Sequence, residues 1–419
     1  MKLILPIPVR RAIDQLQQAG YAAYAVGGCV RDHVLGNTPH DYDICTAAVP
    51  EKMQEIFRNE HTVETGIQHG TLTVIMDHMP LEITTFRQDG EYLDGRHPVS
   101  VLFTPRVEDD LSRRDFTINA MAYAPDAGII DPFGGREDCK AGIIRCVGEA
   151  KKRFSEDALR ILRALRFSAR LGFEIEANTA QAVHELKNTL QKVSRERIQT
   201  ELTGLLQGDY AAQILLEYAD VLLETMPEMA YLVGKEDFWQ LARRALSHLP
   251  KEEMLRWAAL AQYMAPAPDE CVRAALAAMK GLKMSVKMQE GVATLAKWSK
   301  AAITPGNLQE MLMHLGKEHL EKLLLLQRAN ALAAGRDAAA VQAEYEKHCA
   351  KLAELISKNA CYSLAQLQVN GRDMAALGFR GAEIGERLHC LLLKVVRGEI
   401  ANEKNALLNA AQGCFFYGI

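Results

Sequence analysis

Aromatic residues, proline and paired cysteines are scarce in this sequence. Aromatic side chains make up 6% of the 419 residues and proline occurs 14 times, while alanine and leucine are frequent. We therefore expect a mostly helical globular protein rather than a collagen-like or disordered one. The nine cysteines are scattered and form no CxxC pair, which argues against a zinc ribbon, an iron–sulfur site and a secreted disulfide framework.

Long apolar runs are missing as well. No stretch reaches the roughly 18 apolar residues that cross a membrane, and the opening sequence MKLILPIPVRR turns basic too early for a signal peptide. We expect a soluble protein of the reducing cytoplasm, with two to four domains of about 150 residues each.

Charge is unevenly distributed along the chain. The formal net charge of −4 argues weakly against a nucleic-acid partner. Between residues 140 and 200, however, there are 13 lysines and arginines against 7 acidic residues. Such a basic segment within an acidic protein indicates a nucleic-acid-binding surface, although a solvated helical surface would have the same composition.

The first 140 residues differ from the rest. Short segments rich in β-branched residues predict strands, and the last two of them, on either side of residues 77–80, predict a hairpin. After about residue 150, apolar residues recur at helical spacing. The expected fold class is α+β, with a small sheet first and helices to the end. The expected strands cover residues 21–26, 42–45, 71–76 and 81–86, and the expected helices include 50–58, 158–171, 198–206, 254–263, 274–282 and 320–333.

The sequence GGCVRD, residues 27–32, follows the first expected strand. Two glycines let backbone amides approach a phosphate, because no side chain blocks them, and the next helix can direct its N-terminus at an anion. Arg31 can add a forked contact, so Gly28 and Arg31 are candidate nucleotide-binding residues. The spacing matches neither GxGxxG nor GxxxxGK[ST], and an ordinary tight turn would also use two glycines.

Asp41 and Asp43 are separated by one residue, so on a strand their side chains project from the same face. Two adjacent carboxylates repel unless a cation lies between them, and oxygen ligands suit Mg²⁺ shared with substrate phosphates. The pair predicts a metal site for phosphoryl transfer, although a polar loop often has the same pattern. Glu82 and Asp110 are alternative candidates for a third carboxylate.

A second polar cluster covers residues 109–120. Arg113 and Arg114 are expected to precede a helix and to neutralise a triphosphate, and Asn119 can bond a ribose hydroxyl. Surface ion pairs at the start of a helix would give the same sequence.

Asp157, Arg160, Arg163 and Arg166 recur at three-residue spacing and predict one polar stripe on a helix. A carboxylate that accepts from an amino group, next to a guanidinium that donates to a ring nitrogen or carbonyl, matches the base edges of cytosine and adenine. Uracil and guanine present a ring N–H instead, and each unpaired buried group costs about 1–3 kcal/mol. A row of helix ion pairs is the alternative.

At these residues the sequence resembles the class II tRNA nucleotidyltransferases and poly(A) polymerases of the polymerase-β-like superfamily, and especially the bacterial CCA-adding enzymes. The likeness covers roughly residues 20–200 and is weaker beyond. The segments that carry it, in the family's order, are GGCVRD, DYD (41–43), GIQHGTLTV (66–74), LEITTFR (81–87), DGEYLDGRHP (89–98), DDLSRRDFTINAMAY (109–123), IIDPFGG (129–135) and EDALRILRALRFSARLGF (156–173).

The resemblance implies a role for each matching residue. Asp41 and Asp43 would be the catalytic, Mg²⁺-binding pair. The implied nucleotide-binding residues are Gly28, Arg31 and Arg114 at the phosphates, Asp157 and Arg160 at the base, and Arg163 and Arg166 in support. Arg87, Asp89, Tyr92, Arg96 and His97 would belong to the loop linked to the switch from C to A addition.

The resemblance also implies four parts. They are a nucleotidyltransferase head (1–140), a base-reading helical neck (141–207), a helical body (208–330) and a tRNA-binding tail (331–419). In the body, Gln262-Tyr263 stands where related HD phosphohydrolase domains have His-Asp, so that activity is not expected.

The implied function is the addition of CCA to the 3′ end of tRNA from CTP and ATP, with Mg²⁺ as cofactor. An A-only enzyme, a poly(A) polymerase and a tRNA-binding protein with an inactive head remain alternatives. The sequence does not predict an oligomeric state.

Overall fold

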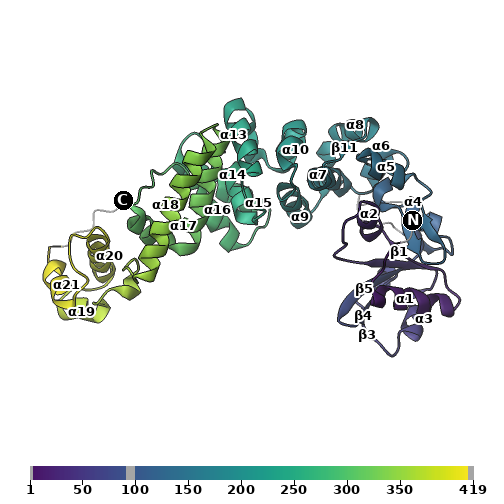
Figure 1. Cartoon of the computed structure of the whole chain (residues 1–419), viewed down its shortest axis with the longest axis horizontal. Coiled ribbons are helices and arrows are strands. Elements are labelled where there is room, and N and C mark those ends of the chain that lie inside the picture. Colours follow the sequence, from purple (N-terminus) through teal and green to yellow (C-terminus); the bar gives the residue numbers. More distant parts are fainter. Residues whose placement is uncertain (1–2, 91–99, 414–419) are drawn as a thin grey trace. The chain divides into compact units, whose positions relative to one another are not determined.

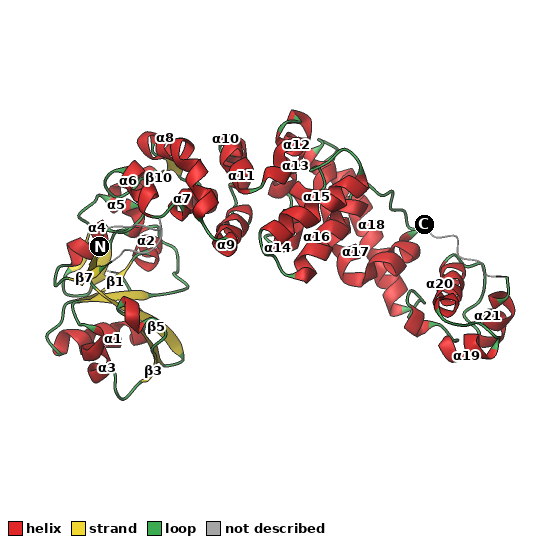
Figure 2. Cartoon of the chain, turned by 180° about the vertical axis from the view of Figure 1, so that it is seen from behind, coloured by secondary structure: helices red, strands yellow, loops and turns green. Residues whose placement is uncertain are grey.

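A computed structural model describes residues 3–90 and 100–413 of the chain (Figure 1). The contacts divide the chain into two compact units, Met1–Pro227 and Glu228–Ile419. Strands and helices share the first unit, whereas the described part of the second is helical (Figure 2). The expected α+β fold, with a small sheet before the helical domains, is confirmed. No helix among the described residues has the length and apolarity needed to cross a membrane.

The first unit is built on a seven-stranded sheet in the order β3-β4-β5-β2-β1-β8-β9. Only β2 and β5 pair in parallel; their register aligns Asp43 with Glu82, and β1 pairs Val26 with Asp43. The register therefore places the end of β1, the start of β2 and the middle of β5 side by side on three adjacent strands. The strands are β1 (Ala23–Val26), β2 (Asp43–Thr46), β3 (His61–Val63), β4 (Thr71–Met76), β5 (Met79–Thr85), β8 (Ala122–Ala124) and β9 (Gly128–Ile130).

The expected hairpin joins β4 and β5. Its two turn residues, Asp77 and His78, have φ angles of 51° and 65°, as a two-residue turn with the twist of the flanking strands requires. β5 begins at Met79, two residues before the predicted start. Pro80 is tolerated there because β2 pairs only with residues 82–85, so β5 is still an edge strand at Pro80.

Helices cover the sheet and continue into the rest of the unit. α1 buries apolar residues at helical spacing, among them Val9, Ile13 and Leu16, and α1 and α3 lie beside the sheet (Figure 1). Two further strand pairs, β6 with β7 and β10 with β11, lie outside it. These elements are α1 (Ile7–Gln18), α2 (Gly28–Val34), α3 (Pro50–Ile56), α4 (Val107–Ser112), α5 (Gly135–Ala141), β6 (Arg87–Asp89), β7 (Val101–Phe103), β10 (Ile143–Ile144) and β11 (Glu174–Ile175).

The remaining helices of the first unit pack mainly around α7, which contacts α9 and α10. Gly204 of α9 leaves room for the stem of Arg166, because a Cβ at residue 204 would lie 2.5 Å from Arg166 Cδ. The helices are α6 (Ala150–Glu156), α7 (Leu159–Leu171), α8 (Ala177–Leu186), α9 (Arg195–Leu206), α10 (Ala211–Glu217) and α11 (Ala219–Thr225).

The second unit consists of helices in its described part. α17 has a kink at Gly316, whose φ is 70°, and packs against α18 and α13. The helices are α12 (Ala230–Val233), α13 (Glu236–Ser247), α14 (Glu253–Ala261), α15 (Pro268–Gly281), α16 (Val286–Trp298), α17 (Leu308–Ala333), α18 (Ala338–Ser357), α19 (Gly371–Ala376), α20 (Ala382–Val396) and α21 (Lys404–Ala411).

Gln262 and Tyr263, which stand where related HD phosphohydrolase domains have His-Asp, have a structural role here. Gln262, which is buried, exchanges two hydrogen bonds with Asn330 of α17, at 3.0 and 2.8 Å. Tyr263 stacks on Phe238 at 5.5 Å between ring centres. The two side chains thus join helices of the body.

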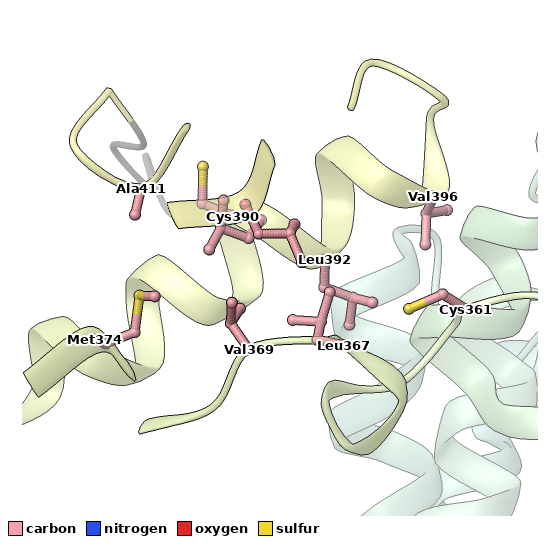
Figure 3. Packing of buried hydrophobic residues seen from close by; sticks show 10 residues of the cluster. Cys361, Leu367, Val369, Met374, Cys390, Leu392, Val396 and Ala411 are labelled. Atoms are coloured by element: carbon pink, nitrogen blue, oxygen red, sulfur yellow. The ribbon is translucent and has the colours of Figure 1, made fainter. Parts of the chain in front are cut away.

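The last three helices share an apolar core of their own. Met374 of α19, Leu391 of α20 and Leu407 of α21 are fully buried in it. Leu367 and Val369, from the segment before α19, also pack into this core (Figure 3).

Candidate active site

The paired aspartates lie where β2 begins. Asp43 is the first residue of β2, Asp41 precedes it by two residues, and both are exposed. Partial burial raises the pKa of Asp43, the neighbouring carboxylates of Glu82 and Asp41 raise it further, and Arg114 opposes the shift. Three carboxylates therefore concentrate negative charge here. Among the described residues, no three His, Cys, Asp or Glu side chains lie close enough together to hold a metal ion.

The two candidates for a third carboxylate differ in their surroundings. Asp110 is fully buried and accepts hydrogen bonds from Arg113 at 2.8 Å and from Arg114 at 3.3 Å. Burial alone would raise the pKa of Asp110, but the two guanidinium groups lower it. Glu82 is exposed and forms no hydrogen bond or ion pair within the described ranges. Only Glu82 has oxygens that are not already used by the protein.

The turn after β1 requires glycine at its first position. Gly27 has a φ of 79° and a ψ of −130°, a conformation that other residues rarely adopt. A Cβ at Gly27 would lie only 2.9 Å from Nη1 of Arg114, so the turn and Arg114 are packed against each other. Gly28 begins α2.

Arg114 lies between the buried Asp110 and the exposed aspartates. It lies between α4 and a short 3-10 helix, Thr117–Asn119, so Arg113 and Arg114 end one helix and precede the next. Burial would lower the pKa of Arg114, but the negative charges of Asp110 and Asp43 raise it. Its buried Nε has no hydrogen-bond partner within residues 3–90 and 100–413. This guanidinium is therefore charged and retains donors for a ligand.

Arg31 is buried and its hydrogen bonds are made within the protein. It donates to Asp32 at 2.7 and 2.9 Å and to Asn119 at 2.7 Å. The Asn119 amide in turn donates to Asp115 at 3.2 Å. Both polar groups of the Asn119 side chain are thus engaged, and Arg31 anchors α2 to the segment around residue 119.

Asp115 continues this network into the neck helix α7. Its carboxylate accepts from Arg163 at 2.7 Å. Burial alone would raise the pKa of Asp115, but Arg163 and the hydrogen bond from Asn119 lower it to about 2. Arg163 and Arg166 also form ion pairs with Glu201 of α9.

One aromatic ring lies among three of these cations. The guanidinium carbons of Arg31, Arg163 and Arg166 lie 5.2, 5.3 and 4.4 Å from the ring centre of Phe167. Cation–π contacts of this kind stabilise desolvated guanidinium groups. Through their ion pairs with Asp115 and Glu201, Arg163 and Arg166 also connect the segment after α4 to α9.

Asp157 lies between two helices, not on the predicted helical stripe. It ends α6 with extended backbone angles of −147° and 104°, and its carboxylate accepts from the backbone N–H of Leu159 at 3.1 Å. Aspartate is favoured at helix starts because it satisfies such free N–H groups. The carboxylate also accepts from Arg197 of α9, at 2.7 and 3.3 Å.

Arg160, in the first turn of α7, bridges the neck and the head. It donates to Glu156 at 2.7 Å, to the carbonyl of Arg153 at 3.0 Å and to the carbonyl of Arg113 at 3.1 Å. The residue after Arg113 is Arg114, which interacts electrostatically with Asp43. A hydrogen bond from the neck helix to Arg113 and the charge interaction of Arg114 with Asp43 therefore link α7 to the aspartates.

Comparisons with known proteins agree with this arrangement. A model of the poly(A) polymerase head domain matches residues 23–145, one of an RNA- and SrmB-binding site of polymerase A matches residues 172–232, and one of tRNA nucleotidyltransferase domain 2 matches residues 248–411. The CCA-adding enzyme of Limosilactobacillus fermentum is 35% identical over 406 residues, which cover 96% of each chain. The chain belongs to the family of CCA-adding enzymes, which are nucleotidyltransferases.

Other members of the CCA-adding enzyme family are similarly related. The enzyme of Geobacillus stearothermophilus is 38% identical over 402 residues, 94% of each chain. That of Leuconostoc mesenteroides is 49% identical over 222 residues, 53% of this chain and 55% of the relative. The crystal structure of the Bacillus stearothermophilus CCA-adding enzyme in complex with CTP superposes with a TM-score of 0.81 at 32% identity and covers 98% of both chains.

Sequence reasoning missed several residues of the site in this member of the CCA-adding enzyme family. Asp115 and Phe167 lie within segments that carry the family resemblance, and Glu201 lies in the expected neck, but the sequence showed no pairing pattern for these side chains. Arg197 is 40 residues from Asp157, and only the packing of α9 beside α7 brings the two together.

The loop expected to take part in the switch from C to A addition is described at its ends only. Asp89 forms an ion pair with Arg87, with 3.4 Å between Oδ1 and Nε, and its Oδ2 lies 3.8 Å from Nη1 of Arg113. Tyr92, Arg96 and His97 lie outside the described residues.

Proposed function

We propose that this chain adds C, C and A in turn to the 3′ end of tRNA, from CTP and ATP and without a template strand. One observation carries the proposal: Arg160 contacts the carbonyl of Arg113, and the adjacent Arg114 lies in the field of Asp43. A single bound nucleotide could then meet Asp43 and Arg114 with its phosphates and the start of α7 with its base.

Asp41 and Asp43 would hold Mg²⁺, and Glu82, which pairs in register with Asp43 but does not complete a three-carboxylate cluster among the described residues, would approach as the third carboxylate when the ion binds. Carboxylate oxygens suit this ion, which completes its shell with water and substrate phosphates and therefore needs few protein ligands. The raised pKa of Asp43 is compatible with the assignment: burial is its main cause, and the charges of Glu82 and Asp41 add to it, so a divalent cation would relieve part of the cost of ionisation. When bound, Mg²⁺ lowers the pKa of the primer 3′-hydroxyl and neutralises the triphosphate.

Arg114 would hold the triphosphate of the incoming nucleotide. Its charge is fixed by Asp110, and its Nε is free to donate. The turn at Gly27 keeps side chains away from the same place. The 3′-hydroxyl would attack the α-phosphorus in line and release pyrophosphate, so the protein supplies position and charge rather than a covalent nucleophile.

Asp157 and Arg160 would read the base. The Asp157 carboxylate can accept from the amino group of cytosine or adenine. Arg160 has five donors and uses three of them in the protein, so two remain for a ring nitrogen or carbonyl. Arg163 and Arg166 would act as positioning residues, because their partners are Asp115 and Glu201.

The helical body and tail would hold the acceptor arm of tRNA, mainly through its shape and phosphates. We assign the reaction to the cytoplasm, and the free thiols support this assignment: the eight cysteines of the described ranges form no disulfide, and seven of them are buried. A reducing compartment maintains thiols in this state.

Incubation of the purified chain with Mg²⁺ and tRNA that lacks CCA tests the proposal, with each labelled nucleotide supplied alone and in combination. We expect two CMP residues from CTP alone and a complete CCA end from CTP with ATP. Incorporation of ATP while CTP is ignored would identify an A-only enzyme or poly(A) polymerase. The Asp41→Ala, Asp43→Ala double variant is the control, and full activity in it would reject the assigned site.

A further inference from the structure

The second unit contains a small polar pocket between α17 and α18. The pocket has a volume of about 80 Å³. By the same measure one water molecule needs roughly 10–15 Å³, so the pocket has room for several waters or for one group of the size of a phosphate. The charged and hydrogen-bonding residues that line it are Gln327 and Arg328 of α17, Arg336 of the connecting turn, and Glu344, Tyr345 and His348 of α18.

Arg328 is the unusual residue of this pocket. Its guanidinium carbon lies 5.4 Å from the ring centre of Tyr345, and its buried Nε has no hydrogen-bond partner. Within residues 3–90 and 100–413, the guanidinium forms no hydrogen bond or ion pair at all. A buried donor without a partner costs about 1–3 kcal/mol, and such groups are rare in native proteins.

Arg328 is half-buried, and the two arginines of the same unit that are buried as whole residues are paired with protein acceptors. Arg256 donates to the carbonyls of Leu249 and Pro250, at 2.9 Å each. Arg387 donates to the carbonyl of Ala411 and forms an ion pair with Glu383, at 3.2 Å each. An unsatisfied buried Nε is not unique to Arg328, but the guanidinium of Arg243 donates a hydrogen bond to Gln240, whereas that of Arg328 forms none within the described ranges.

The remaining lining residues add no net negative charge to the pocket. Glu344 is the one acidic side chain among them, and it is neutralised by Arg336 at 2.9 Å. His348 is 7% exposed and forms no hydrogen bond within the described ranges. The Gln327 amide donates to backbone carbonyls, the closest being Ala301 at 2.8 Å. Arg328 thus leaves the pocket with an uncompensated positive charge and with free donors.

We propose that this pocket binds a phosphate group, held by the guanidinium of Arg328 with Arg336 and His348 beside it. A phosphate offers several acceptor oxygens and negative charge, which match the fork geometry of a guanidinium. The group is either a backbone phosphate of RNA or free phosphate. Neither source involves the nucleotide site of the first unit, so the pocket can be tested independently of CCA addition.

Hydrogen–deuterium exchange of the full chain tests the pocket directly. Metal-free protein is compared with and without 20 mM inorganic phosphate, and the ionic strength is held constant with sodium chloride. We expect amide exchange in the segment 324–348 to slow by about threefold or more in phosphate. In Arg328→Gln the protection disappears, whereas it persists in Arg273→Gln, which removes the same charge from a side chain that is 72% exposed.

The outcome in the wild-type chain is decisive even if Arg328→Gln fails to fold. No slowing of exchange in this segment by phosphate overturns the proposal, and so does equal slowing in a folded Arg328→Gln protein.

Binding of tRNA that lacks CCA then identifies the source of the phosphate. If RNA supplies it, Arg328→Gln weakens binding about 3- to 10-fold and reduces the slope of log K against log salt by about 1, as expected for one lost phosphate contact. Arg273→Gln leaves both quantities unchanged. Unchanged tRNA binding in Arg328→Gln, together with protection by inorganic phosphate, identifies free phosphate as the ligand.

Discussion

Arg197 holds the carboxylate of Asp157 from the neighbouring helix α9, with nitrogen–oxygen distances of 2.7 and 3.3 Å. The backbone N–H of Leu159 binds the same carboxylate at 3.1 Å. These contacts fix the carboxylate plane of a residue that lies between α6 and α7 and so has no helical backbone to orient it. If Asp157 reads the base, Arg197 is a positioning residue for that reading.

Arg197→Ala should therefore relax base choice. We expect the preference for CTP and ATP over UTP and GTP, measured as a ratio of kcat/KM values, to fall about 10-fold, because a misplaced acceptor loses about 1–3 kcal/mol of discrimination. The Kd for tRNA should change less than twofold. Arg170→Ala is the matched control, because Arg170 is an exposed arginine of α7. Exclusion of UTP and GTP at the wild-type level in Arg197→Ala would contradict the assignment.

Neutralising Glu82 should lower activity, whereas neutralising Asp110 should lower stability. Glu82→Gln should lower nucleotide incorporation about 10-fold or more and leave Tm within about 1 °C, because Glu82 is exposed and has no partner among the described residues. Asp110→Asn should lower Tm by several degrees, because Arg113 and Arg114 lose a buried counter-ion, a change that costs about 3–5 kcal/mol. Normal activity in Glu82→Gln would exclude it as the third carboxylate.

Local pattern predicted much of the fold. The hairpin of β4 and β5 was predictable because alternation and turn residues are both local signals. The order of the strands was not, because β1 pairs with β2 and β8, and β2 pairs in parallel with β5. Only this register makes Glu82 a neighbour of Asp43. The sequence alone therefore left Glu82 and Asp110 as equal candidates for the third carboxylate.

The candidate site shows the same limit. Three-residue spacing assigned Asp157 to one stripe with Arg160, but an aspartate that caps a free N–H ends the helical pattern at that point. Asn119, Asp115 and Glu201, which bind Arg31, Arg163 and Arg166, come from other elements, and no spacing along one segment reveals them.

The raised pKa of Asp43 makes a further prediction about stability. A carboxyl whose pKa is higher in the folded state is destabilising once ionised, so this cost is present at pH values above the folded pKa. Asp43→Asn should then raise Tm by about 1–2 °C at pH 7.5 without metal, which corresponds to about 0.5 kcal/mol after allowance for solvent screening.

The same Asp43→Asn variant should lose at least about 100-fold in activity and should no longer be stabilised by Mg²⁺. Asp14→Asn serves as the control, because Asp14 is exposed and remote in sequence from the site. A lower Tm in Asp43→Asn would show that the carboxylate contributes stabilising contacts and would contradict the electrostatic account.

The buried pair of Asp115 and Arg163 should make the free energy of unfolding depend on pH in the acid range. The pKa of Asp115 is about 2 in the folded chain against a usual 3.8, so its stabilisation is complete above about pH 4 and is lost as the pH falls towards 2. This group alone should account for a loss of about 2 kcal/mol of unfolding free energy over that window. Asp115→Asn should therefore be less stable than wild type at pH 7 by about 2–4 kcal/mol, because Arg163 loses its closest partner, and the difference should shrink below pH 3. Urea unfolding at pH 7, 4 and 2.5 measures both effects, and a difference that does not depend on pH would mean that the asparagine acts through packing instead of charge.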